Sequence, residues 1–74
     1  AIYPNPTSGQ FTISSSLELI SEIKVYDETG RLIQVISKNE NQVNIDLSTC
    51  ADGIYSLEIE TALGKSRERI ILNK

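Results

Sequence analysis

The hydropathy pattern of this 74-residue chain alternates with a period of two, and no stretch keeps the 3.6-residue period of an amphipathic helix. Short alternating runs are separated by clusters of turn-forming residues, which is the pattern of strands joined by tight turns. A chain of this length forms at most one domain and buries about 60–65% of its unfolded surface. We therefore predict a single all-β domain, either a sandwich or a barrel.

Six segments carry the strand pattern, and a further short edge strand at Leu17–Leu19 would make seven. The six are Gln10–Ser14, Glu22–Asp27, Arg31–Ser37, Gln42–Leu47, Ile54–Thr61 and Arg67–Asn73. The strictest alternation predicts that Tyr55, Leu57 and Ile59 point inward, because successive side chains of a strand face opposite sides of the sheet. The same rule predicts a second buried set: Val43, Ile45 and Leu47.

The chain opens with a leader, Tyr3-Pro4-Asn5-Pro6, that two prolines make stiff and extended. Neither proline has an N–H to donate, so this segment cannot be a central strand. Ser8 and Gly9 then supply a turn before the first alternating run. We divide the chain into residues 1–9, the Pro-Asn-Pro entry segment, and residues 10–74, the β-rich domain.

The sequence Asp27-Glu28-Thr29-Gly30-Arg31 predicts a three-residue hairpin loop. Asp27 opens a type I turn by accepting hydrogen bonds from its own backbone, and Gly30 takes the left-handed position. The loop predicts the pairs Asp27–Arg31, Val25–Ile33 and Ile23–Val35, with the opposite face formed by Tyr26, Leu32, Lys24 and Gln34.

Two further turns are expected in the middle of the chain. Lys38–Asn41 is wholly polar and predicts a turn between two strands. Ser48–Gly53 predicts a loop, with a short helical turn as an option at Ser48–Ala51.

The last hairpin admits two registers. A two-residue loop at Leu63–Gly64 places Arg67 and Arg69 on the wet face, whereas a three-residue loop at Ala62–Gly64 turns both inward. We favour the first, because burying unpaired charge is costly. It predicts the pairs Glu60–Arg67, Glu58–Arg69, Leu57–Ile70 and Tyr55–Leu72, and it leaves Glu68 facing inward opposite Ile59.

The net charge of −3 and the pI of about 4.7 argue against binding to nucleic acid or to anionic membranes, which requires a basic face. No apolar run is long enough to span a bilayer, and the N-terminus lacks the basic and apolar regions of a signal peptide. If the protein is exported, we expect its export signal on a longer precursor.

No catalytic or metal-binding constellation is recognisable. The chain has no His, and Cys50 is its single Cys, which we interpret as a small half-buried residue. Glu58 and Glu60 share one strand face beside arginines, so we interpret them as solvated ion-pair partners. Calcium sites at Asp27-Glu28 or at Asp46 with Asp52 lack the dense ligand alternation of a calcium loop. We predict no enzyme activity, no cofactor and no small-molecule substrate.

Motifs along the whole chain resemble one known family. They are Tyr3-Pro4-Asn5-Pro6-x-x-Gly9-x-Phe11-x-Ile13, Ile23-x-Val25-Tyr26-Asp27-x-x-Gly30-Arg31, Ile45-Asp46-Leu47-Ser48, Gly53-Ile54-Tyr55 and Arg69-Ile70-Ile71-Leu72-Asn73-Lys74. In this order and at this spacing, they are similar to the C-terminal sorting domain of cargo proteins of the type IX secretion system of Bacteroidetes.

The resemblance implies a small Ig-like antiparallel β-sandwich of about seven strands, fused to an N-terminal cargo. It also implies a non-catalytic secretion signal that is read, after Sec export, in the periplasm by type IX translocon components at the outer membrane. A sortase-like cysteine peptidase then usually cleaves it in the linker before the Pro-Asn-Pro motif, and the cargo reaches the cell surface or the extracellular space.

The family motifs carry recognition candidates over to this chain: Pro4, Asn5, Pro6, Gly9, Gly30, Arg31, Gly53, Tyr55, Ile71, Leu72 and Lys74. The glycines also suit turns and Tyr55 also suits the core, so the leader and the terminal strand are the stronger candidates, since neither is demanded by the core. The alternative is an Ig-like accessory module that binds carbohydrate or protein. Of the aromatic residues that carbohydrate binding uses, only Tyr3 and Tyr26 are plausible.

Overall fold

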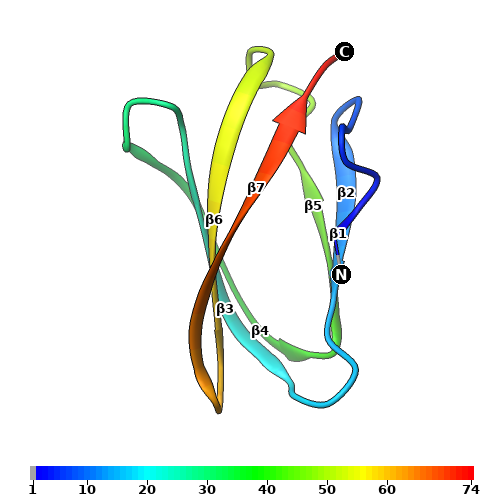
Figure 1. Cartoon of the computed structure of the whole chain (residues 1–74), viewed down its shortest axis with the longest axis vertical. Coiled ribbons are helices and arrows are strands. Elements are labelled where there is room, and N and C mark those ends of the chain that lie inside the picture. The colour runs from blue at the N-terminus through cyan, green and yellow to red at the C-terminus, as the bar shows by residue number, and fades with distance from the viewer. Residues whose placement is uncertain (1) are drawn as a thin grey trace.

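The computed structural model describes residues 2–74, which form an all-β sandwich of two antiparallel sheets (Figure 1). The described residues make seven strands: β1 (Ile2–Tyr3), β2 (Gln10–Ser14), β3 (Ile20–Tyr26), β4 (Leu32–Glu40), β5 (Gln42–Asp46), β6 (Gly53–Thr61) and β7 (Gly64–Leu72). One sheet has the order β1-β2-β5, and the other has the order β4-β3-β6-β7. The predicted fold class is confirmed.

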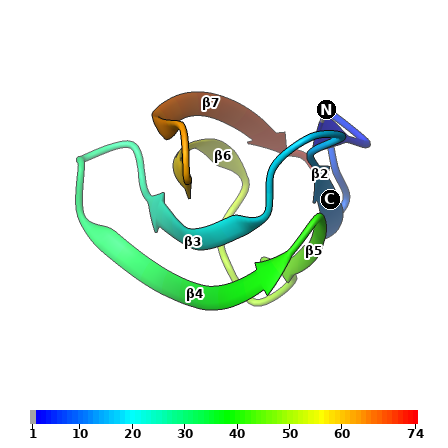
Figure 2. The same cartoon turned by 90° about the horizontal axis from the view of Figure 1, so that it is seen from below.

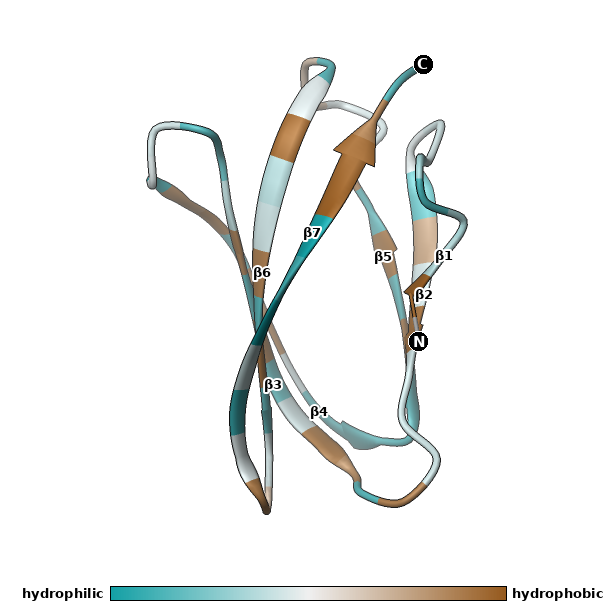
Figure 3. Ribbon diagram, in the orientation of Figure 1, coloured by the Kyte–Doolittle hydropathy of each residue, from teal (hydrophilic) through white to brown (hydrophobic). Residues whose placement is uncertain are grey.

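The core lies between the two sheets and is built from the alternate side chains of the strands. Its fully covered members come mostly from β3, β5 and β6: Phe11, Ile13, Ile20, Ile23, Val25, Val43, Ile45, Leu47, Tyr55, Leu57, Ile59, Ile70 and Leu72. The inward sets predicted on β5 and β6 are therefore confirmed. Figure 3 shows apolar residues on the upper part of β7 and hydrophilic residues on its lower part.

The chain passes from one sheet to the other between β4 and β5. Figure 2 shows β4 curving from the four-stranded sheet toward β5. Only Asn41 separates the two strands, so the polar turn predicted at Lys38–Asn41 is wrong: β4 continues through Glu40, which pairs with Ile20.

Among the described residues no helix could span a membrane.

The β3–β4 turn forms as predicted, but the register beyond it does not. The N–H of Asp27 donates to the carbonyl of Arg31 at 3.0 Å, and Gly30 has a φ of 86°. Tyr26 then pairs with Leu32, whereas Val25 pairs with Gln34, so Ile33 is an extra residue in a β-bulge.

The bulge reverses part of the predicted facing of β4, because an added residue shifts the side-chain alternation by one. Val35 is 47% exposed and pairs with Lys24, not with Ile23. Ile36 takes the place opposite Ile23, and Gln34 lies opposite Val25. The predicted pairs Val25–Ile33 and Ile23–Val35 are therefore wrong.

The last hairpin also differs from the favoured prediction. Thr61 pairs with Gly64, so the two-residue loop is Ala62–Leu63 and not Leu63–Gly64. The shift keeps the predicted facing, because two positions equal one full side-chain repeat. The pairs change to Glu60–Lys65, Glu58–Arg67, Leu57–Glu68 and Tyr55–Ile70.

Smaller corrections concern segments outside the main strands. Leu17–Leu19 is not a strand, and Leu17 is 87% exposed. Ser48–Ala51 contains a turn, in which the N–H of Cys50 donates to the carbonyl of Leu47, but no helix. Ile2–Tyr3, which was not predicted as a strand, pairs with β2 at the sheet edge.

Candidate functional site

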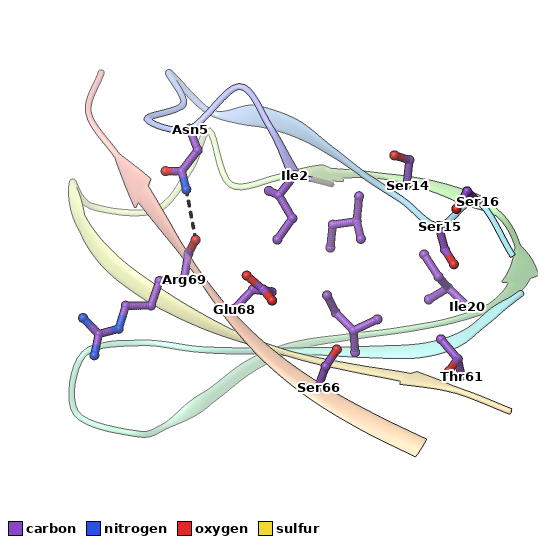
Figure 4. A pocket seen from close by; sticks show the side chains of 12 residues that line it. Ile2, Asn5, Ser14, Ser15, Ser16, Ile20, Thr61, Ser66, Glu68 and Arg69 are labelled. Atoms are coloured by element: carbon purple, nitrogen blue, oxygen red, sulfur yellow. Dashed lines mark hydrogen bonds between the residues drawn. The ribbon is translucent and has the colours of Figure 1, made fainter. Parts of the chain in front are cut away.

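The leader lies along the outer edge of the C-terminal strand, although the two are separated by more than 60 positions in sequence. Asn5 Nδ2 donates to the carbonyl of Arg69 at 3.1 Å (Figure 4). Asn5 Oδ1 accepts the N–H of Ile71, also at 3.1 Å. The Asn5 side chain thus hydrogen-bonds to β7 as the backbone of a neighbouring strand would. The Tyr3–Pro4 and Asn5–Pro6 peptide bonds that flank this contact are both cis.

Thr7 extends the contact with its backbone. Its N–H donates to the carbonyl of Ile71 at 2.8 Å, and its carbonyl accepts the N–H of Asn73 at 2.8 Å. Asn5 and Thr7 together form what we call the N-terminal clasp. The clasp occupies the outer edge of β7 from the Arg69 carbonyl to the N–H of Asn73.

Thr7 is held in place by burial and by its own hydroxyl. The residue is 1% exposed, and its Oγ1 donates to the carbonyl of Gln10 at 2.7 Å and accepts the N–H of Gly9 at 3.1 Å. A buried hydroxyl must be hydrogen-bonded to avoid a desolvation penalty, and this one both donates and accepts a hydrogen bond. Sequence reasoning missed this role, because Thr7 stands in a stretch of turn residues.

Gly9 packs against the loop that follows β5. The N–H of Leu47 donates to the carbonyl of Gly9 at 2.7 Å, and a Cβ on Gly9 would lie 3.1 Å from the Cβ of Ser48. Its φ of 151° is one that other residues rarely adopt. Glycine at this position therefore answers a packing and backbone requirement.

The C-terminus is tied to the same loop. The backbone N–H of Lys74 donates to Asp52 Oδ1 at 3.1 Å, and its Nζ donates to the carbonyl of Ser48 at 3.1 Å. Tyr55 reaches the loop from β6, with its hydroxyl donating to the carbonyl of Ala51. The terminal lysine thus has defined partners in the fold.

The β3–β4 turn joins this end of the sandwich. Asp27 Oδ1 accepts hydrogen bonds from the hydroxyl and N–H of Thr29 and from the N–H of Arg31, at 2.6, 2.9 and 3.0 Å. These bonds, the Thr29 hydroxyl first, hold the pKa of Asp27 below its usual range. Glu28 Oε1 accepts the N–H of Ile54 at 3.0 Å, which attaches the turn to the start of β6.

Most recognition candidates therefore gather at one end of the molecule, at the top of Figure 1. The clasp, the β3–β4 turn, the loop before β6 and the C-terminus all lie there. Two of the candidates are core residues, since Leu72 is 1% and Tyr55 is 7% exposed. The view that the core does not demand the terminal strand is wrong for Leu72, whereas Ile71 is 43% exposed.

A family model for the secretion system C-terminal sorting domain matches residues 1–73. The chain belongs to this family. No curated protein matches it at a significant level. Domains of the family are the C-terminal sorting signals of type IX secretion, so this sorting domain is fused to a cargo, interacts with the type IX machinery, and directs export to the cell surface or the extracellular space.

A groove opens between the sheets of the sorting domain, on the side where β7 faces β1 (Figure 4). Its volume is about 490 Å³, and its apolar lining consists of Ile2, Ile13, Ile20 and Ile59. Glu68 points into it, whereas Arg69 points away. Sequence reasoning missed the groove, although the inward facing of Glu68 was a sign of it, because a carboxylate at an inward position requires access to water.

The outer face of β6 and β7 in the sorting domain carries paired charges. Glu58 lies 3.4 Å from the guanidinium of Arg67 and 3.8 Å from Nζ of Lys65. Arg67 also stands 6.0 Å from the centre of the Tyr26 ring. The predicted ion pairing of Glu58 is confirmed, with Arg67 and Lys65 as its partners, and the expected pairing with Arg69 is wrong. Among the described residues, Glu60 forms no ion pair.

The described residues contain no group of three or more His, Cys, Asp or Glu side chains close enough to hold a metal ion. Asp27 is committed to its own turn, and Asp46 accepts the N–H of Ser48 at 2.8 Å. Cys50 is half-buried and packs against the core, which confirms its interpretation as a small structural residue.

Proposed function

We propose that this sorting domain is a non-catalytic module recognised through the end of the sandwich that carries the N-terminal clasp and the C-terminus. The observation that supports this is the joining of the leader to β7 by Asn5 and Thr7. Residues from both ends of the domain thereby form one continuous surface, which an outer-membrane receptor contacts without unfolding the domain.

Within that surface, the exposed candidates are the proposed contacts. Pro4, Asn5, Pro6, Arg31, Ile71 and Lys74 present side chains there. The remaining candidates are proposed to act through the fold: Gly9, Gly30, Gly53, Tyr55 and Leu72. Residues 10–74 form most of the sandwich in this proposal, and residues 1–9, whose Ile2–Tyr3 pairs with β2, connect it to the cargo.

The proposed export route places the recognition of the sorting domain outside the cytoplasm. The fused precursor crosses the inner membrane by Sec export, and translocon components bind the domain in the periplasm. A sortase-like cysteine peptidase at the outer membrane then cleaves before Pro4. Cleavage upstream of the domain fits the fold, because the pairing of Ile2–Tyr3 with β2 and the hydrogen bonds of Asn5 and Thr7 hold the chain from Ile2 onward.

A reporter fusion tests the proposal in a bacterium with type IX secretion. We expect a secreted reporter that has lost the domain, and a periplasmic fusion in a strain that lacks the translocon. Ile71→Ser and Lys74→Ala should each lower export while the purified variants keep the thermal stability of the wild type. Undiminished export by the combined variant would contradict recognition at this end.

A further inference from the structure

The outer edge of β7 is divided into two halves. The residues whose N–H and C=O point away from β6 are the odd-numbered ones, as the clasp's bonds to Arg69, Ile71 and Asn73 show. The clasp covers the upper half. In the lower half, none of the described residues hydrogen-bonds to the outward backbone groups of Lys65 and Arg67.

An unpaired strand edge is a template for another strand, and proteins normally cover or shorten it. Here the bare half of β7 lies next to the groove between the sheets. Ser66 and Glu68 line that groove from β7, at the inward positions that Ile70 and Leu72 take farther along the strand. A strand added at this edge would place alternate side chains at the mouth of the groove, beside Ser66 and Glu68.

The charges on β7 from Lys65 to Arg69 indicate which kind of partner strand would bind at this edge. Its outward side chains, Lys65, Arg67 and Arg69, are all basic, and of these only Lys65 and Arg67 have a carboxylate partner, which they share. Among the described residues, Arg69 forms no ion pair. The edge is therefore cationic in a chain whose net charge is −3.

A second copy of the domain is a poor occupant of this edge. Antiparallel self-pairing centred on Arg67 would place Arg67 against itself and Lys65 against Arg69. Like charges directly opposite one another destabilise a strand pair. An extended segment with acidic residues at alternate positions instead meets each of these cations.

We propose that the outer edge of β7 from Lys65 to Arg69 binds, by strand addition, an extended acidic segment of a partner protein. Acidic side chains of that segment lie beside Lys65, Arg67 and Arg69, and its intervening side chains face the groove. This surface lies below the clasp and is separate from the end of the sandwich proposed above for recognition.

The probe for this site is a synthetic eight-residue peptide that alternates Glu with Val, added to the isotope-labelled domain. We expect it to shift the backbone amide resonances of Lys65, Arg67 and Arg69 more than those of β4, the opposite edge of the same sheet. A peptide that alternates Lys with Val should bind at least about tenfold more weakly, because it reverses the charge complementarity.

Two substitutions at Arg67 separate the contribution of its backbone N–H to peptide binding from the contribution of its side-chain charge. Arg67→Pro removes the charge and the outward N–H, and proline is tolerated where its nitrogen faces away from the sheet. Arg67→Thr removes only the charge. We expect Arg67→Thr to weaken binding a few-fold and Arg67→Pro to weaken it by about a further factor of ten, the value of one hydrogen bond.

The thermal stability of both variants establishes that they are folded. If Arg67→Pro does not fold, the wild-type domain with a Glu–Val peptide methylated at alternate amides provides the same comparison, and loss of binding is expected for one of the two methylation patterns. Absence of binding at about 1 mM peptide, equal binding of the Lys–Val peptide, or shifts centred on β4 would overturn the proposal. So would concentration-dependent dimerisation that Arg67→Pro abolishes.

Discussion

At the scale of single residues, Asn5 replaces the strand that would otherwise cover the end of β7. Its amide satisfies a donor and an acceptor of β7, at 3.1 Å each. Exposed hydrogen bonds of this kind contribute about 0.5–1.5 kcal/mol each. We expect Asn5→Ala to lower the free energy of unfolding by about 1–2 kcal/mol, as measured by urea denaturation.

Asn73→Ala is the matched control for that change. Asn73 bonds to the clasp only through its backbone N–H, which the substitution retains. Its stability should stay within about 0.5 kcal/mol of the wild type. Equal losses for the two variants would mean that the Asn5 amide has no special role.

Asp27 sets the acid sensitivity of the β3–β4 turn. Its pKa is lowered in the folded state by the Thr29 hydroxyl and by backbone N–H groups, so the folded state binds the proton less tightly than the unfolded chain. Its contribution is therefore present above the unfolded pKa of about 3.9 and is lost as the pH falls through the folded value. We expect wild-type stability to fall between about pH 5 and pH 2, and Asp27→Ala to fall less.

Asp46 provides a second, independent test of the same argument. Hydrogen bonds from the side chain and the backbone N–H of Ser48 lower the pKa of Asp46 as well. Asp46→Ala should likewise flatten the acid limb, and the two effects should add, because the residues share no partner. If thermal melts showed that both variants lose as much stability in acid as the wild type does, the predictions for Asp27 and Asp46 would be wrong.

At the scale of the elements, the C-terminal part of β7 alternates buried residues, which stabilise the fold, with exposed residues, which form its surface. Leu72 is 1% exposed, whereas its neighbour Ile71 is 43% exposed. Truncating a buried leucine to alanine costs about 2–5 kcal/mol, a large part of the roughly 4–11 kcal/mol expected for a domain of this size. We expect Leu72→Ala to lower the melting temperature strongly and Ile71→Ala to change it little.

This difference decides how export experiments on the C-terminus are interpreted. Deleting Ile71–Lys74 would remove Leu72 together with two of the clasp's partners, Ile71 and Asn73, so a loss of export could come from unfolding. Substitution at Ile71 changes the surface alone. If Ile71→Ala destabilised the domain as much as Leu72→Ala, this division of β7 would be wrong.

Sequence patterns predicted a local turn and the facing of side chains, but not the register between strands. Turn chemistry identified the β3–β4 loop correctly, because Asp27 and Gly30 act locally. Turn chemistry did not predict the pairs beyond Tyr26–Leu32, because the bulge at Ile33 shifts their register. Alternation placed Tyr55, Leu57 and Ile59 inward, but a shift of two residues in the β6–β7 hairpin preserves alternation and so could not be detected.

At the scale of the whole molecule, the sorting domain depends on contacts between its two ends. No local pattern could predict the clasp, because hydrogen bonds between Asn5 and β7 join residues more than 60 positions apart. The resemblance to a family identified the candidate residues, but it did not predict how the fold arranges them in space. The fold brings the leader, Gly9, the β3–β4 turn and Lys74 to one end of the sandwich.

If the machinery reads that arrangement, the signal is a shape and not a linear peptide. Leu57 is fully buried in β6 and is not itself a recognition candidate, so Leu57→Asp should unfold the domain while leaving every candidate residue in place. We expect a fused reporter with this change to lose export, measured as the fraction of reporter in the medium. Ser56→Asp introduces the same acid one position away on the outward face beside Arg69, and it should keep both fold and export. Export that survives Leu57→Asp in a domain shown to be unfolded would mean that the terminal sequence is read without the sandwich.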